Sequence, residues 1–217
     1  MDASTLLSRL DCPLIPVVVI DRLDDAVPLA EALLQGGISA LEITLRTPVA
    51  CEAISAMKSA LPDAVIGAGT VSSGEAYGAA VQAGADFVVS PGATDQLFKT
   101  AAAHVVPFLP GAVTGSEVLR AMEFGYAALK FFPAEAAGGT PALQALSGPV
   151  PDVNFMPTGG VTPDNVTTYL QLKNVCAVGG SWLTPRELLI GQQWEALYQL
   201  AADSVAQVTT MSRGASE

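Results

Sequence analysis

The sequence predicts an α/β fold: a single (β/α)8 TIM barrel preceded by a short N-terminal helix. Three observations support this prediction. Short apolar runs alternate with helix-like segments eight times along the 217 residues, a length that suits one barrel. The runs are nearly continuously apolar, as is typical of parallel strands buried on both faces. Glycines recur between a helix and the next strand, at Gly36–Gly37, Gly84 and Gly125, where a left-handed helix cap is favoured.

The predicted elements follow one another in a regular order. An amphipathic helix is expected at residues 4–10, and strands are expected where apolar runs end in glycine, proline or small residues: 14–20, 40–45, 64–68, 87–89, 106–109, 127–133, 153–156 and 176–178. Helices are expected between and after them, at 25–35, 48–60, 73–83, 95–103, 115–123, 141–146, 163–171 and 192–207. Pro16 counts against a central strand at the first run. We interpret residues 1–217 as one barrel domain with a core of about 13–207 and a disordered, polar tail at 208–217.

Composition excludes several classes of function. The net charge is −11 and no basic stripe is present, which argues against nucleic acid or an anionic membrane as a partner. No apolar segment is long enough to span a membrane, and the first residues do not resemble a signal peptide, so we expect a cytoplasmic protein. Cys12, Cys51 and Cys176 lack C-x-x-C spacing and are expected to be reduced thiols. A single histidine, His104, argues against a histidine-rich metal site and against a nucleophile triad that depends on histidine.

Lys130 is the one ionisable residue in the apolar run at 127–133, whereas the other three lysines lie near the ends of predicted helices. A buried lysine must be paired, functional, or extended toward water from the strand end. The second strand places Glu42, Thr44 and Arg46 on one face. Glu42 and Arg46 could form an ion pair that merely satisfies both charges. Because strands two and six of eight face each other, Glu42 and Lys130 could instead form an acid/base and nucleophile pair, with burial favouring the free amine.

Glycine-rich turns follow three of the strands. Gly67-Ala68-Gly69-Thr70 lacks the spacing of a Walker phosphate loop, and its glycines permit close approach of backbone or ligand. Thr158-Gly159-Gly160 and Gly179-Gly180-Ser181 follow strands seven and eight, the usual position of a phosphate site in these barrels. Thr162-Pro163 looks like the start of a helix directed at that site. The alternative is that these are tight turns that need glycine.

As a set, these segments resemble the family of 2-keto-3-deoxy-6-phosphogluconate (KDPG) aldolase and 4-hydroxy-2-oxoglutarate aldolase. The motifs are LEITLRT at 41–47, GAGT at 67–70, SPG at 90–92, LPG at 109–111, KFFPAE at 130–135, PTGG at 157–160 and GGSW at 179–182. The resemblance implies a class I lyase of the Entner–Doudoroff pathway that cleaves KDPG to pyruvate and glyceraldehyde 3-phosphate. It implies that Lys130 forms the Schiff base, and that Glu42 is the general acid/base. The substrate-binding residues that it implies are Arg46, Thr70, Pro91, Phe132, Thr158, Gly159, Gly160, Gly180 and Ser181. It also implies a phosphorylated keto acid as ligand, no metal and no cofactor, and a cytoplasmic homotrimer.

Three alternatives remain open. A sibling aldolase for 2-keto-3-deoxy-6-phosphogalactonate or 4-hydroxy-2-oxoglutarate would use the same Lys130 and Glu42. A sugar-phosphate epimerase or isomerase would use the phosphate turns without an imine, although a metal-dependent version fits a chain with one histidine poorly. A non-catalytic sugar-phosphate sensor would not need Lys130.

Overall fold

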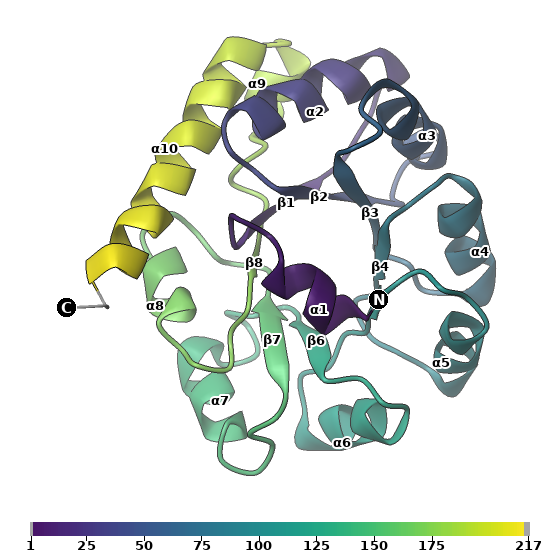
Figure 1. Ribbon diagram of the computed structural model, residues 1–217, viewed down its shortest axis with the longest axis vertical. Helices are drawn as coiled ribbons and strands as arrows, with labels where there is room; N and C mark the ends of the chain where they lie inside the picture. Colours follow the sequence, from purple (N-terminus) through teal and green to yellow (C-terminus); the bar gives the residue numbers. More distant parts are fainter. Residues whose placement is uncertain (1, 215–217) are drawn as a thin grey trace.

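The computed structural model describes residues 2–214, and it has the predicted architecture of eight strands surrounded by helices (Figure 1). The strands are β1 (Leu14–Val18), β2 (Ala40–Thr44), β3 (Val65–Gly69), β4 (Phe87–Val89), β5 (Phe108–Leu109), β6 (Ala128–Phe131), β7 (Asn154–Pro157) and β8 (Val178–Gly180). Around them lie α2 (Ala26–Gln35), α3 (Ala50–Ala60), α4 (Gly74–Gln82), α5 (Asp95–Ala102), α6 (Gly115–Glu123), α7 (Gly139–Leu146), α8 (Val166–Leu170), α9 (Arg186–Ile190) and α10 (Trp194–Gly214). A short helix, α1 (Ala3–Ser8), precedes β1, and a 3-10 turn, η1 (Leu23–Asp25), precedes α2.

The parallel strands close into a ring. Six of them pair in the order β5-β4-β3-β2-β1-β8, and β6 pairs with β7. Isolated bridges complete the circle, with Gly111 joined to Lys130 between β5 and β6, and Thr158 joined to Gly179 between β7 and β8. Pro16 is accommodated because β1 pairs with β8 at residues 14–16 and with β2 only from Val17 onward. The predicted barrel is therefore confirmed.

Successive side chains of each strand point alternately outward and inward, so the barrel has one apolar core between strands and helices and a second inside the ring. On β2 and β6, Leu41, Ile43, Leu129 and Phe131 point outward and belong to the large core under the helices. Residues that point inward, such as Ala128 of β6, belong to a second cluster inside the ring. Leu7 of α1 joins this inner cluster beside the first residues of several strands, so α1 closes the N-terminal end of the barrel, as its central place in Figure 1 shows. The inner residues near the C-terminal ends of the strands are left to form a site.

Several predicted boundaries change. Helix α8 begins at Val166 and not at residue 163, because the side chain of Asn165 accepts a hydrogen bond from the Thr162 N–H and holds residues 162–165 in a turn. The segment at 186–190, which we did not predict as a helix, forms α9. Helix α10 continues to Gly214, beyond the predicted end of the last helix at residue 207. The disorder of the tail stays a prediction, and its residues 215–217 lie outside the described residues. Of the predicted left-handed glycines, Gly37, Gly84 and Gly125 are confirmed, with φ of 93°, 87° and 85°, whereas Gly36 has φ of −71°.

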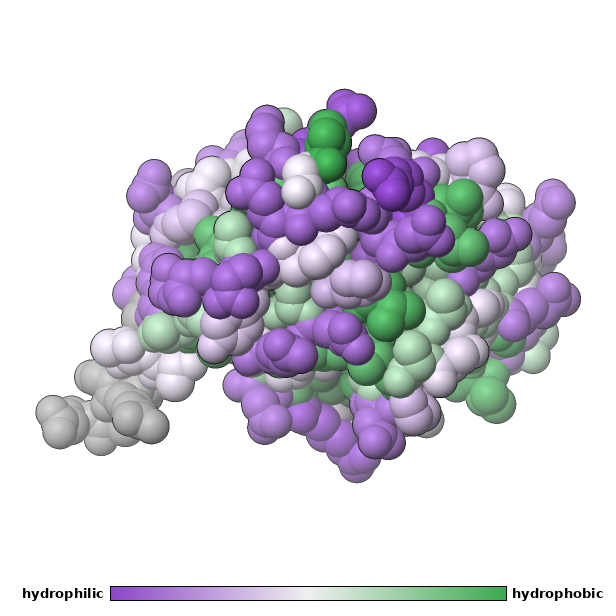
Figure 2. All heavy atoms as spheres, turned by 90° about the horizontal axis from the view of Figure 1, so that it is seen from above, coloured by the Kyte–Doolittle hydropathy of each residue, from purple (hydrophilic) through white to green (hydrophobic). Residues whose placement is uncertain are grey.

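One face of the outer surface is mostly polar. Figure 2 shows the face seen from above the view of Figure 1, on which hydrophilic residues predominate and hydrophobic ones emerge in small groups. Within residues 2–214, every helix is too short or too polar to span a membrane. Scattered apolar side chains of this kind are normal for the outer face of a barrel.

Candidate active site

The centre of the site is a buried ion pair between the two residues that the sequence placed on opposite strands. Lys130 Nζ lies 2.8 Å from Glu42 Oε1 and 3.2 Å from Oε2. Only 5% of Lys130 and none of Glu42 is exposed to solvent. β2 and β6 lie on opposite sides of the ring (Figure 1), so long side chains from each meet at the barrel axis. The amine also lies 5.6 Å from the centroid of the Phe132 ring.

Gly69 of β3 creates the space that the Glu42 carboxylate occupies. A Cβ atom added at position 69 would lie 2.1 Å from Glu42 Oε1 and 2.5 Å from its Cγ. Real Cβ atoms do not approach a neighbour this closely, so only glycine fits here without moving Glu42. Gly67 similarly leaves room for the ring of Phe87, which would lie 2.3 Å from a Cβ atom added at position 67. The glycines of the GAGT motif therefore make room for neighbouring side chains rather than for a ligand.

Arg46 does not pair with Glu42, contrary to the structural alternative derived from the sequence. Its Nε donates a hydrogen bond to Thr70 Oγ1 at 3.2 Å, while Glu42 is occupied by Lys130. The reason is geometric: Arg46 lies beyond the end of β2, and its long side chain extends along the rim toward Thr70. Thr70 itself has φ of +60°, an unfavourable conformation for a β-branched residue. Such backbone strain costs about 1–3 kcal/mol and is concentrated at functional sites.

These residues surround a small cavity of about 110 Å³ at the C-terminal ends of the strands. Eight of the predicted site residues line it: Arg46, Thr70, Pro91, Lys130, Phe132, Thr158, Gly159 and Ser181. Val17 also lines it, and the sequence offered no signal for Val17 because it is one apolar residue within an apolar strand. The structure thus brings the predicted set together from strands distant in sequence.

Three of the predicted residues do not line the cavity: Glu42, which is fully buried and reaches the site through its contact with Lys130, and the glycines Gly160 and Gly180. Gly160 has φ of +80°, and a Cβ there would lie 2.5 Å from Cγ of Glu135, so Glu135 covers this position. A Cβ at Gly180 would lie 2.3 Å from the ring of Trp182. Neither glycine lines the cavity itself, so any contact that they make with a ligand would be through the backbone.

Thr158 has a buried hydroxyl that lacks a partner within the described part of the chain. A Cβ at Gly179 would lie 2.2 Å from this oxygen, so the glycine leaves space for it. A buried polar atom without a partner is costly unless a ligand or water satisfies it. The Thr158 hydroxyl is therefore available for hydrogen bonding within the cavity.

Glu135 and Tyr169 hold the turn after β7 in place. Tyr169 of α8 donates a hydrogen bond to Glu135 Oε1, and the Glu135 N–H donates to the carbonyl of Gly159 at 3.1 Å. Burial, together with the carboxylate of Glu135, raises the pKa of the Tyr169 phenol above its ordinary value. The phenol thus stays protonated and donates to Glu135, which rests against Gly160.

With this geometry established, comparison with known proteins decides the family. Residues 8–200 match the family described as "Aldolase: KDPG and KHG aldolase". The chain belongs to the KDPG and KHG aldolase family. A KHG/KDPG aldolase of Escherichia coli strain K12 is 45% identical over 193 residues, which cover 89% of this chain and 91% of that protein. A 2-dehydro-3-deoxy-phosphogluconate aldolase of Dickeya dadantii is 46% identical over 197 residues, with 91% and 92% covered.

A solved aldolase structure extends the similarity to three dimensions. The KDPG aldolase of Legionella pneumophila, described with pyruvate captured at low pH as a covalent carbinolamine intermediate, superposes with a TM-score of 0.89. It is 45% identical in sequence, and the match covers 92% of this chain and 96% of that one. The family resemblance noted in the sequence is thereby confirmed, while the role of each site residue stays a prediction.

Proposed function

We propose that the chain is a class I aldolase that cleaves KDPG to pyruvate and glyceraldehyde 3-phosphate through a Schiff base on Lys130. The contact between Lys130 and Glu42 at the base of a small cavity carries this proposal. A buried carboxylate within 2.8 Å can accept a proton from the ammonium and leave a free amine. The capture of pyruvate as a covalent carbinolamine by the Legionella pneumophila relative supports the same chemistry here.

The proposed reaction begins at the keto group. The free amine of Lys130 attacks C2 and a C–N bond forms; Glu42 returns the proton it took from Lys130 to the C2 oxygen, which leaves as water, so that a protonated imine and an ionised Glu42 remain. Glu42 then removes the proton of the C4 hydroxyl, the C3–C4 bond breaks, and its electron pair forms an enamine as glyceraldehyde 3-phosphate leaves. Glu42 returns a proton to C3 of the enamine. Water adds to C2, the C–N bond breaks, and pyruvate departs with the lysine regenerated.

Residues at the rim are proposed to orient the substrate. Arg46 and Thr70 share a hydrogen bond at 3.2 Å and both line the cavity, which suits them to the carboxylate of the pyruvyl group. The ring of Phe132 and Pro91 supply apolar walls. The turn at Thr158-Gly159-Gly160 and Ser181 are proposed to contact the phosphate, because they follow β7 and β8.

A steady-state assay tests this function. The purified protein is incubated with KDPG, and pyruvate and glyceraldehyde 3-phosphate are measured by separate coupled enzymes. We expect the two products in equal amounts. The galactonate epimer and 4-hydroxy-2-oxoglutarate are assayed in parallel, because the Escherichia coli relative is named for both KHG and KDPG. Release of neither product from any of the three substrates would contradict the proposal.

We also propose that the aldolase acts as a cytoplasmic homotrimer, as the family resemblance implies. Apolar side chains at the surface of α6 and just before β5 offer an area for association: Leu119 and Met122 are exposed, and Val105 is 92% exposed. Sedimentation equilibrium would give three times the monomer mass if the proposal is correct, and the monomer mass if it is not.

A further inference from the structure

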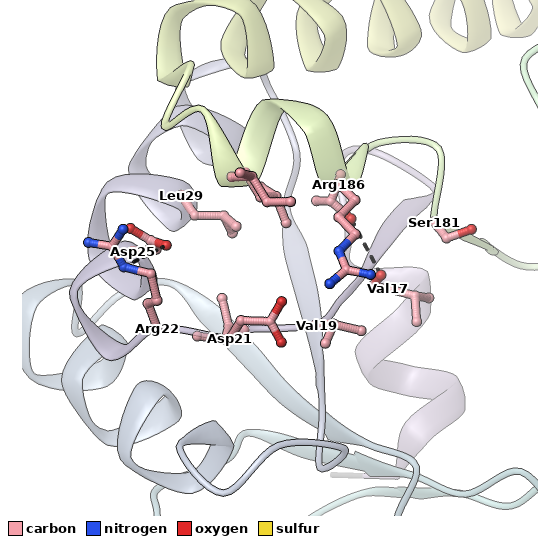
Figure 3. A pocket seen from close by; sticks show the side chains of 12 residues that line it. Val17, Val19, Asp21, Arg22, Asp25, Leu29, Ser181 and Arg186 are labelled. Atoms are coloured by element: carbon pink, nitrogen blue, oxygen red, sulfur yellow. Dashed lines mark hydrogen bonds and ion pairs between the residues drawn. The ribbon is translucent and has the colours of Figure 1, made fainter.

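A second, larger cavity adjoins the candidate active site (Figure 3). Its volume is about 320 Å³, and it lies between the segment that follows β1 and the helix α9. Val17 and Ser181 line both cavities, so the two meet at these residues. We call the larger cavity the side chamber. Its polar lining comes from Asp21, Arg22 and Asp25 in the segment after β1 and from Ser181, Thr184 and Arg186 in the segment after β8.

The small cavity is too small for the whole proposed substrate. Pockets that bury entire small molecules typically have about 300–1,000 Å³. The catalytic cavity, at about 110 Å³, has room for the three-carbon pyruvyl end beside Lys130. The remaining carbons and the phosphate must therefore extend out of it. The side chamber, which opens next to Ser181, is large enough to receive them.

Arg186 is the cation of the side chamber that is available to a ligand. Its side chain extends from α9 into the chamber, between Val19 and Ser181 (Figure 3). Within residues 2–214, Arg186 forms no ion pair, whereas Arg22 is 3.8 Å from Asp25. Asp25 is only 8% exposed and also accepts a hydrogen bond from Gln192 at 2.7 Å. Arg22 is therefore partly neutralised, and Arg186 is not.

The distribution of charge favours an anion at this end of the barrel. The chain has ten Lys and Arg residues against a net charge of −11. Four of the ten, Arg22, Arg46, Lys130 and Arg186, line the two adjoining cavities. Two of these cations are paired, Arg22 with Asp25 and Lys130 with Glu42, so Arg46 and Arg186 are the ones without an ion pair among the described residues. Cations of this kind on an acidic protein attract anionic ligands locally. Arg46, together with Thr70, suits one anionic end of a substrate, and Arg186 suits a second.

We propose that the side chamber receives the distal end of the substrate, and that Arg186 contacts its phosphate and determines the preference for phosphorylated substrates. This inference rests on the proposed function, and Arg186 lies outside all the motifs that carry the family resemblance. The phosphate lies beside Ser181, with the turn after β7 on one side and Arg186 on the other. Asp21, an exposed carboxylate on the rim of the same chamber, opposes the binding of phosphate.

The test compares variants with opposite expected effects. Loss of a charge-assisted hydrogen bond in Arg186→Ala should raise KM for KDPG by about ten- to a hundredfold, with kcat changed by less than about threefold. Arg186→Lys, which keeps the charge but not the forked geometry, should recover part of the loss. Asp21→Asn removes repulsion and should lower KM by about twofold. Lys173→Ala is the control, because it removes one exposed positive charge from a residue that lines neither cavity.

A second measurement separates this inference from the proposed function. Pyruvate lacks the distal end, so the pyruvate concentration that gives half-maximal labelling with borohydride should be the same in Arg186→Ala as in the wild type. If Arg186→Ala has the KM of Lys173→Ala for KDPG, the inference is wrong. It is also wrong if the variant loses pyruvate and KDPG affinity equally. If the wild-type protein is not labelled by pyruvate, the proposed function itself fails.

Discussion

Gly69→Ala should disable the site without altering any residue that contacts the substrate. The added Cβ would lie 2.1 Å from Glu42 Oε1, whereas contacts closer than 3.0 Å essentially never occur, so the carboxylate must move by roughly 1 Å. The backbone of Gly69 is not in the left-handed region, so alanine is tolerated there except for this contact. Displacing a catalytic group by about 1 Å can cost about 10²-fold in rate. Overpacking a core also costs about 1–3 kcal/mol of stability.

The assay follows the proton that Glu42 is proposed to move. In D₂O, the aldolase should exchange the methyl protons of pyruvate through the enamine, and NMR gives the rate. We expect Gly69→Ala to slow this exchange and KDPG cleavage by about 10²-fold, while borohydride still traps pyruvate on Lys130. Gly78→Ala is the matched control, since a Cβ there meets nothing within 4 Å. It lies in α4 and should gain about 0.5–1 kcal/mol of stability with unchanged activity. Wild-type exchange by Gly69→Ala would refute the reasoning.

Four further outcomes are expected. Lys130→Met should abolish cleavage and destabilise the fold by about 3–5 kcal/mol, because Glu42 is left as an unpaired buried charge. Adding Glu42→Gln to this variant should restore most of the stability, measured by urea denaturation, but none of the activity. Thr70→Gly should relieve the strained φ of +60° and raise stability by up to about 1 kcal/mol while raising KM for pyruvate. Burial raises the pKa of the Tyr77 phenol above its ordinary value of 10.0. The contribution of Tyr77 to the free energy of unfolding is therefore complete below about pH 10 and declines above it, because the phenol of the unfolded chain ionises first. Tyr77→Phe, which loses the hydrogen bond to the Val106 carbonyl, should cost about 1 kcal/mol at pH 7, and its deficit should shrink above pH 10; a constant deficit would contradict this. Ser181→Ala should raise KM for KDPG more than it lowers kcat, and an unchanged KM would argue against a phosphate contact.

Much of the fold could be predicted because its determinants are local. Strand β4 and helix α6 were predicted to the residue, since an apolar run and a capped amphipathic segment mark them clearly. Thr114 and Glu117 form a capping box at the start of α6, which fixes where that helix begins. The convergence of Lys130 and Glu42 was also predictable, because strand number alone places β2 opposite β6.

Features that depend on which side chains meet across the rim were not predictable. Arg46 bonds to Thr70 rather than to Glu42 because Arg46 lies beyond the end of β2, whereas Glu42 pairs with Lys130 inside the ring. Helix α9 is only five residues long, too short for a periodic signal, and it carries Arg186 into the side chamber. Val17 lines both cavities but differs in no local property from the valines beside it. These residues acquire their roles only from the assembled barrel.

The most direct test of the proposed mechanism is to incubate the protein with pyruvate and borohydride and to map the added mass by peptide mass spectrometry. The mechanism predicts a reduced pyruvate adduct on Lys130 and on no other lysine, and its absence after Lys130→Met. An unlabelled Lys130 at a high pyruvate concentration, or labelling distributed over Lys58, Lys99 and Lys173, would contradict it and leave Lys130 as a structural partner of Glu42.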